Sequence, residues 1–544
     1  GVACRFEAAS GQVDVTERVE VPAQQRCRAP QLGRVRYVDS LVGFGNVAAC
    51  QRGQGQDQPG GSKRLPARWW GLVGEPQHVG GVGDRVRKTP STQQRIGTDR
   101  QQACVRHDLA CSPCPCDELV EQTCREVDYR FRKRKITPVV TVLHMILSAL
   151  WPEESFNACW QVLWDTFVSW FPQFQGQSPS RRRVSEARGR LPLTLWRRLF
   201  EAVSEQAQQR SEGYDSWKSH RVVLTDGTCV SMTRTPQLVK AFGVNHGHHG
   251  RGRYPLARLV TVCLAGTMTI LDYALGGYRC GESSLLSSLL GSLRPGDLLI
   301  GDRHFAGAPL YVEYQNHGLE FVTRAHHRLQ IAKVKRILRY SPDDFIGRLT
   351  IHKLYRRRDP SLATHIDVRL LKAVVRIRGR RQHVWFTTSL LDPSRYPADQ
   401  IVALYLQRWR IETLFREIKI TLSADVLRSQ SPDGIRKEIA ARLTALNVVR
   451  TVMMEAAATA QIEDPLRISF VHAVRAMLSF SPALGHAPLA AVPAIYQAML
   501  TEIACHINPD RPDRLEPRAL RRERHHYPSL RITRAQWKAR HHAA

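Results

Sequence analysis

Short apolar runs, rich in β-branched residues and separated by helix-forming segments, constrain this chain most. From residue 222 onward the runs read VVLT, LARLVTVCLAG, TILDYALGG and LLIG, and the segment GESSLLSSLLGSL precedes the last of them. Runs of this length fit strands that are buried on both faces, whereas GESSLLSSLLGSL has the spacing of a helix. The order of these segments therefore predicts an α/β core.

Two of the runs are directly followed by a carboxylate. Asp226 follows VVLT and precedes Gly227, and Asp302 follows LLIG. We expect each buried strand to end at its aspartate, so that neighbouring strands place two oxygen ligands side by side. Cations would then offset the repulsion between the two carboxylates. Taken singly, either aspartate is equally typical of an ordinary turn.

A third carboxylate lies on a segment that we predict to be one long helix, from Pro397 through Ile420. Within YLQRWRIETLFREIK, five residues are spaced by 3, 4, 4 and 3 positions, which places them on one helix face. Ion pairs along a solvated face are the simple alternative, and the helix alone favours it. The two strand carboxylates upstream shift the balance towards a functional face. Its members are Tyr405, Arg408, Glu412, Arg416 and Lys419.

Together these segments resemble the DDE transposases of bacterial insertion sequences, specifically the insertion-sequence-4 family. The signature Y-x2-R-x3-E-x6-K of that family is matched by Tyr405, Arg408, Glu412 and Lys419. LTDGT and IGDRHF are similar to its first and second carboxylate motifs, and TRTPQLVKAFG is also similar to its sequence. The resemblance covers roughly residues 117–460. It is specific because three separated motifs occur in the right order.

The resemblance implies a fold and a mechanism. The fold is a ribonuclease-H-like core, a mixed sheet flanked by helices, which a β-strand insertion subdomain interrupts. In the implied mechanism, Asp226, Asp302 and Glu412 hold two divalent ions, magnesium with manganese as a substitute. The same site would nick the transposon end, free it and join its 3′-hydroxyl to target DNA. A homodimer that bridges two ends is also implied.

The resemblance further implies residues that contact DNA. Tyr405, Arg408, Arg416 and Lys419 would grip phosphates near the cleavage point, and the guanidinium of Arg408 would do so through two hydrogen bonds. Surface ion pairing is the alternative for these four. Trp385, in HVWFTTSLL, occupies the position at which related transposases stack an aromatic ring on a flipped base. A tryptophan in a strand is just as often part of the core.

Charge and cysteine content narrow the partners and the compartment. The net charge is +30, from 79 Lys and Arg against 49 Asp and Glu, which indicates a polyanion such as double-stranded DNA. A membrane partner is not expected, because no run of about 18 apolar residues occurs. The odd count of 13 cysteines, without an apolar leader, favours the reducing bacterial cytoplasm, with the protein associated with the nucleoid.

The N-terminal segment differs from the rest of the chain in composition. Eight of the 13 cysteines fall in the first 124 residues, where periodic apolar patterns are nearly absent. A zinc module built on Cys111, Cys114 and Cys116 is the alternative to a poorly ordered or spurious extension, but the spacing matches no zinc module. We therefore expect an extension over residues 1–115, followed by a helical DNA-binding domain (116–215), the first part of the catalytic core (216–329), a β-rich insertion subdomain (330–397), the glutamate helix (398–425) and a helical C-terminal region with a basic tail (426–544).

Two rival functions remain open at this point. The first is a ribonuclease-H-like nuclease that cuts nucleic acid without joining it, because the same metal pair serves both reactions. The second is a regulator or decayed remnant that binds transposon ends without cutting. The three intact carboxylates and the full helix signature argue against decay.

Overall fold

The computed structural model describes most of the chain beyond residue 116. The segments with a described structure are residues 6–7, 117–132, 135–170, 176–247, 250–358, 360, 362–377, 380–509, 535–536 and 539. The expected extension over residues 1–115 and the basic tail thus lie almost wholly outside the described residues. Among the helices in the described ranges, none has both the length and the apolar character needed to cross a membrane.

Among the described residues, five helices precede the first long strand, in the region where the sequence predicts helices. The second of them begins at Pro138, because the Thr137 side chain accepts a hydrogen bond from the N–H of Val140 and proline suits the first turn. Pro192 separates the last two, because its ring cannot donate the hydrogen bond that would continue a helix. The helices are α2 (Asp117–Glu126), α3 (Pro138–Leu150), α4 (Phe156–Trp170), α5 (Arg181–Arg190) and α6 (Leu193–Arg210).

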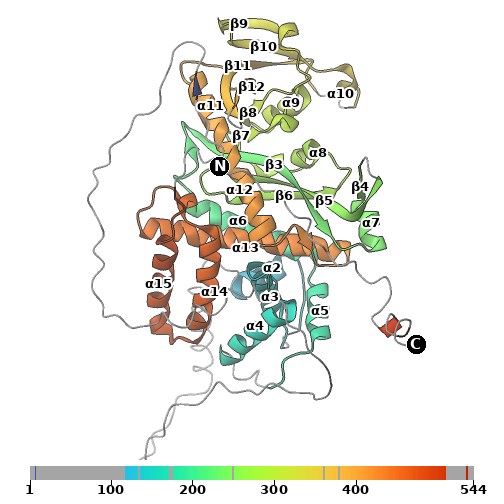
Figure 1. The fold of residues 1–544 in the computed structure, drawn as a ribbon, viewed down its shortest axis with the longest axis vertical. Helices are drawn as coiled ribbons and strands as arrows, with labels where there is room; N and C mark the ends of the chain where they lie inside the picture. The colour runs from blue at the N-terminus through green and yellow to red at the C-terminus, as the bar shows by residue number, and fades with distance from the viewer. Residues whose placement is uncertain are drawn as a thin grey trace, which may run out of the picture. The chain divides into compact units, whose positions relative to one another are not determined.

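A mixed sheet flanked by helices forms the centre of the fold, as predicted (Figure 1). Its strand order is β6-β5-β3-β7-β8; β3, β7 and β8 are parallel, whereas β5 and β6 run antiparallel to their neighbours. The strands are β2 (Ser216–Trp217), β3 (His220–Met232), β4 (Val244–Gly247), β5 (Gly250–Leu264), β6 (Ile270–Gly277), β7 (Leu298–Gly301) and β8 (Glu320–Arg324); the helices between them are α7 (Pro236–Phe242), α8 (Glu282–Ser287) and α9 (Ala308–Asn316).

Four antiparallel strands continue the same sheet beyond β8, in the order β12-β11-β10-β9. The sequence gives no convincing helix in this region, but the structure has a short one, α10, whose six residues KLYRRR carry too few apolar positions to reveal a helical period. The elements are β9 (Lys335–Ser341), β10 (Asp344–Thr350), α10 (Lys353–Arg358), β11 (His365–Ile377) and β12 (Arg380–Thr388); β1 (Phe6–Glu7) pairs with β11.

The segment predicted as one long helix is helical throughout but not regular. It consists of α11 (Ala398–Leu406), a 3-10 turn (Gln407–Trp409), α12 (Arg410–Arg416) and a π-helical turn (Glu417–Thr421). The expectation of one uniform helix period is therefore wrong, because each change of hydrogen-bonding pattern rotates the residues that follow it. Such a change within a helix is often found at a functional site.

The rest of the described chain is helical apart from one short strand. The strongly helical segment predicted around residues 434–460 is confirmed as α13 (Pro432–Thr459), which Ser431 caps by accepting from the N–H of Gly434. The other elements are β13 (Val426–Leu427), which pairs with the end of β3, α14 (Phe470–His486) and α15 (Val492–Ala504). Isolated 3-10 turns occur at Leu290–Ser292, Arg303–Phe305, Ile331–Lys333, Pro465–Arg467 and Leu489–Ala491.

The two faces of the central sheet are buried by different helices. On β3, the side chains of Val222 and Leu224 pack with α12 and α13, whereas Val223 packs with α8 and α9 on the opposite face. Figure 1 shows α12 leading from the sheet towards α13. Because both faces are covered, β3 reads as a continuous apolar run, and polar groups on it lie in a partly dry environment.

Candidate active site

The two strand carboxylates lie on adjacent parallel strands. The register pairs Leu224 of β3 with Ile300 of β7, and Asp302 directly follows the end of β7. The charge of Asp302 contributes to the raised pKa of Asp226, so the two carboxylates lie near each other. The expectation that both strands end at their aspartate holds for β7 but is wrong for β3, which continues to Met232 because β5 and then β13 still pair with it.

Asp226 is a largely buried carboxylate with limited compensation. Its side chain is 19% exposed; Oδ2 accepts a hydrogen bond of 3.0 Å from Nη1 of Arg408, and Oδ1 accepts one of 2.8 Å from the N–H of Gly227. Burial raises the pKa of Asp226 to about 6; Arg408 and Gly227 oppose the rise, whereas the charges of Asp302 and Glu282 add to it. The site therefore holds more negative charge than its own cations offset.

Arg408 joins the helical run to the strand carboxylates. It lies in the 3-10 turn between α11 and α12, and besides Asp226 it contacts Glu412, with 3.8 Å between Nη2 and Oε1. Burial by itself would lower the pKa of Arg408, but Tyr405, Asp226, Asp302 and Glu412 together raise it. The three predicted carboxylates thus act on one guanidinium. The Glu412 side chain is 54% exposed, which leaves the site open on the helix side.

Glu282 brings a fourth carboxylate to the same place. It is the first residue of α8, and Arg258 lies 3.6 Å from its Oε1. A Cβ atom added to Gly227 would come within 2.7 Å of the Glu282 Cδ, so a larger residue at this position on β3 would make the Glu282 side chain shift. From the sequence we interpret Glu282 as a helix-start residue. It does begin α8, but its carboxylate also adds to the charge on Asp226.

Asp302 is oriented by the turn that follows it. It caps the 3-10 turn Arg303–Phe305; its Oδ1 accepts from the N–H of His304 at 2.7 Å, and its Oδ2 lies 3.2 Å from Nδ1 of the same histidine. These contacts hold the carboxylate in place while the His304 ring remains largely exposed. His304 is therefore a direct neighbour of the site.

The other residues of the predicted helix face do not share one environment. Tyr405 is buried with its ring against Phe386, and Asp302 contributes to the raised pKa of its hydroxyl, for which burial is the main cause. Lys419 is half-buried; burial lowers its pKa, and Cys229 of β3 and Asp425 are the charges that oppose this. Both thus lie on the sheet side of the helical run.

Arg416 points elsewhere. It lines a cavity of about 400 Å³ together with Arg410, Thr413 and residues that precede and begin α14. Arg416 is the last residue of α12 and lies four positions after Glu412, so both are on one side of this helix, but the Arg416 side chain lines this cavity.

Trp385 is partly buried in the core beside β11 and β10. Its ring makes an edge contact with Phe345, with 5.9 Å between ring centroids, and Nζ of Lys372 lies 6.0 Å from its centre. It belongs to the side chains that pack against the core on the α9 face of the sheet. This packing favours the alternative in which Trp385 is structural.

The donor set fits hard divalent cations. Asp226, Asp302 and Glu412 offer only carboxylate oxygens, the ligands that magnesium and manganese prefer. Burial raises the pKa of Asp226 in spite of its contact with Arg408, and a bound cation would favour the ionised carboxylate.

Sequence comparison assigns the class. Residues 217–448 match the family model described as "Transposase DDE domain", a range that includes β3, β7 and the run from α11 to the π-helical turn. The chain therefore carries a transposase DDE domain, which indicates an enzyme that cleaves DNA and transfers its strands; transposases bind DNA, and domains of this family generally use divalent metal ions.

A curated relative narrows the class. The chain is 24% identical over 351 residues to "Transposase InsG for insertion sequence element IS4" of Escherichia coli (strain K12), an alignment that covers 64% of this chain and 77% of that protein. The chain is thus similar to a transposase of an insertion sequence of the IS4 type. Among solved structures, it is similar to the piggyBac transposase synaptic complex with hairpin DNA, with a TM-score of 0.37, 11% identity, and coverage of 76% of this chain and 87% of that chain.

Proposed function

We propose that this transposase binds the terminal inverted repeats of an insertion sequence, cleaves the DNA at those ends and joins them to target DNA by cut-and-paste transposition. The observation that carries the proposal is the convergence of Asp226, Asp302 and Glu412 on the guanidinium of Arg408. The net charge of +30 supports double-stranded DNA as the substrate.

Asp226, Asp302 and Glu412 would hold two divalent ions, magnesium with manganese as a substitute. When bound, the ions activate the attacking water or 3′-hydroxyl and stabilise the leaving oxygen of the phosphodiester hydrolysis and transesterification. The carboxylates act only as ligands in this scheme, so no covalent intermediate between protein and DNA forms. The contact of Asp302 with the N–H of His304 fixes one ligand before any ion arrives.

Arg408 would change partners when DNA and cations bind. Its guanidinium now serves Asp226 and Glu412, and its Nε, although buried, has no hydrogen-bond partner among the described residues. Cations that neutralise the carboxylates would release the guanidinium to bind a phosphate of the DNA through two hydrogen bonds. Arg408 is therefore the first candidate for a phosphate contact in this site.

The structure supports the other predicted DNA contacts to different degrees. Lys419, half-buried beside β3, would add a second positive charge near the phosphates, and the buried Tyr405 would position Arg408 more than it contacts DNA. Arg416 would contact DNA outside the carboxylate cluster. A base-stacking role for Trp385 would require the ring to leave its contact with Phe345.

The proposal also covers the fold of the core, the helices that bind DNA and the assembly of the active form. The mixed sheet with helices on both faces supports a ribonuclease-H-like core, with β9 to β12 as the β-rich insertion between the second aspartate and the glutamate. Helices α2 to α6 would bind DNA. The active form would be a homodimer that bridges two transposon ends in the bacterial cytoplasm, in association with the nucleoid.

The test is cleavage of labelled DNA that carries the element's own terminal repeats, in magnesium, by wild type and Glu412→Gln. Glu212→Gln, at an exposed position in the turn after α6, serves as the matched control. We expect Glu412→Gln to bind the ends but not to cut them, and Glu212→Gln to cut like wild type. Normal cutting by Glu412→Gln would overturn the site assignment.

Two further outcomes separate the rival functions. Binding without cutting in all three proteins would identify a non-catalytic regulator or remnant. A pre-cut end with a free 3′-hydroxyl tests joining directly. Cutting without joining would identify a ribonuclease-H-like nuclease.

A further inference from the structure

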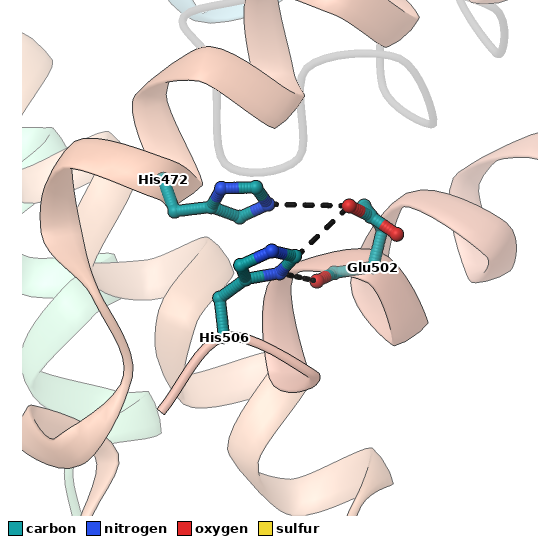
Figure 2. A group of neighbouring side chains, drawn as sticks. All are labelled: His472, Glu502 and His506. Carbon is teal, nitrogen blue, oxygen red and sulfur yellow. Dashed lines mark hydrogen bonds and ion pairs between the residues drawn. The ribbon is translucent and has the colours of Figure 1, made fainter. Parts of the chain in front are cut away.

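A histidine and glutamate cluster lies outside the matched transposase domain, where α15 ends beside the start of α14. His472, Glu502 and His506 converge there, with one candidate ligand atom from each within 4.8 Å of the others (Figure 2). The Nε2 of His472 lies 3.3 Å from Oε1 of Glu502, and Nδ1 of His506 lies 3.8 Å from the same oxygen. The two imidazole rings stack, with 3.2 Å between their centroids.

Backbone hydrogen bonds hold the cluster in place. Ile468 and Ile507 form a β-bridge, and the N–H of Ser469 donates to the carbonyl oxygen of His506 at 2.9 Å. These bonds join the residues before α14 to the residues after α15. The spacing of Glu502 and His506 by four residues then places both on one face of the end of α15. The three side chains are thus positioned by the fold, as a preformed metal site requires.

The donor set has the chemistry of a transition-metal site. Two imidazole nitrogens and one carboxylate oxygen are the ligands that zinc binds in open sites, where water takes the fourth position. Metal–ligand bonds of about 2.0–2.1 Å in a tetrahedron place ligand atoms about 3.3 Å apart, and the distance between His472 Nε2 and Glu502 Oε1 is 3.3 Å. The side chains are 25% to 46% exposed, so an ion can enter and water can reach it.

A backbone contact also orients one ring. His506 Nδ1 lies 3.1 Å from the carbonyl oxygen of Glu502, which helps to hold the ring beside the Glu502 carboxylate.

We propose that His472, Glu502 and His506 bind one divalent transition-metal ion, of which zinc is the best match, and that this ion fastens the end of α15 to the start of α14. The site differs in chemistry from the carboxylate cluster of the transposase domain, because imidazole ligands select zinc over magnesium. An ion bound by these three side chains would stabilise the C-terminal helices and leave the carboxylate cluster of the transposase domain unchanged.

The test is cobalt or zinc titration of the full chain in excess magnesium, with His472→Ala and His506→Ala as the test variants. His383→Ala, at an exposed histidine of β12, is the matched control, and Asp302→Asn removes a ligand of the carboxylate cluster. Cobalt absorption separates this site from any cysteine site, because only thiolate ligands add a sulfur charge-transfer band. Unfolding temperature with and without zinc is measured on the same proteins.

Wild type, His383→Ala and Asp302→Asn should each bind the ion without thiolate ligands and gain in unfolding temperature when zinc is added. His472→Ala and His506→Ala should lose affinity by at least about 100-fold, more than a lost supporting contact costs. Glu502→Gln keeps the shape of the side chain, so a loss of metal affinity in this variant is not caused by misfolding. Unchanged affinity in the histidine variants, or no such ion bound by wild type, would overturn the proposal.

Discussion

Two buried carboxylates in this protein are treated in opposite ways by their surroundings. Glu438 of α13 accepts hydrogen bonds from the N–H groups of Arg428 and Ser429 and from Nη1 of Arg442, at 2.7 to 3.2 Å. Burial would raise its pKa, but Arg442 and those N–H groups lower it below the ordinary value. Asp226 is largely buried as well, but here burial raises the pKa to about 6; Arg408 and the N–H of Gly227 offset only part of the rise, and the charges of Asp302 and Glu282 add to it.

The difference separates a structural charge from a functional one. Every acceptor position of Glu438 is used within the protein, so the residue needs nothing more. Asp226 itself has one guanidinium and one backbone N–H, and it lies near two further carboxylates, Asp302 and Glu282. Uncompensated negative charge of this kind destabilises the free protein and favours a bound cation, a trade between stability and activity that functional sites often show.

Asp226→Asn should have the largest effect on cleavage, and it tests the comparison at the carboxylate to which we assign a function. Losing a metal ligand removes several kcal/mol of transition-state stabilisation, so magnesium-dependent cutting should fall by about a thousandfold or more. At pH 7 without metal the variant should be more stable than wild type, by up to about 3 kcal/mol, because a carboxylate whose pKa is about 6 is costly to keep ionised. Cleavage assays and chemical denaturation measure the two effects. A variant that is both inactive and less stable would contradict the interpretation that the charge of Asp226 destabilises the metal-free protein and is retained for a bound cation.

Glu438→Gln should act in the opposite direction. Removing the charge leaves Arg442 buried without its partner, which we expect to cost about 3–5 kcal/mol in the free energy of unfolding. Denaturation measures the loss, and cutting per folded molecule should stay near that of wild type. A stability equal to that of wild type would mean that the ion pair between Glu438 and Arg442 within α13 contributes nothing to stability.

A third buried group sharpens the comparison through pH. His144 of α3 is fully buried with one hydrogen bond, to the carbonyl oxygen of Phe156, and burial lowers its pKa to about 4. The folded state therefore binds fewer protons than the unfolded state between about pH 4 and 6.5, and stability should fall by about 3 kcal/mol as the pH drops through that window. Denaturation at pH 7, 5.5 and 4.5 should show a weaker pH dependence in His144→Gln. An unchanged slope would place the acid sensitivity elsewhere.

The smallest expected effect is that of Glu282→Gln. Removing this charge lessens the repulsion on Asp226 but also weakens the attraction for cations, so half-maximal cutting should need about three- to tenfold more magnesium. The maximal rate should change less than tenfold. A loss as large as that of Asp226→Asn would show instead that Glu282 is itself a ligand.

The sequence was most informative where the pattern was local. Apolar runs predicted the α/β core, and the long apolar and basic pattern after residue 432 predicted α13. The proximity of Asp226 and Asp302 was predicted from two apolar runs followed by carboxylates, and these runs are the paired strands β3 and β7. Their roles, and that of Glu412, stay predictions.

The misses have physical reasons. Residue spacing assumes one helical period, so the 3-10 and π-helical turns that interrupt the predicted helix could not be foreseen. The contact between Glu282 and Gly227 joins residues 55 positions apart, and no local pattern records it. The signal that could have found it is Gly227 itself, since a glycine inside a buried strand often marks a close approach.

The most direct test of metal binding by the three carboxylates is a metal-switch measurement on Asp302→Cys. A thiolate is a poor ligand for magnesium but a tolerable one for softer manganese. We expect almost no cleavage by the variant in magnesium. The ratio of its cleavage rate in manganese to its rate in magnesium should be at least tenfold higher than the same ratio for wild type. Full cleavage by the variant in magnesium, or an equal loss in both metals, would contradict the claim that Asp302 holds the catalytic ions.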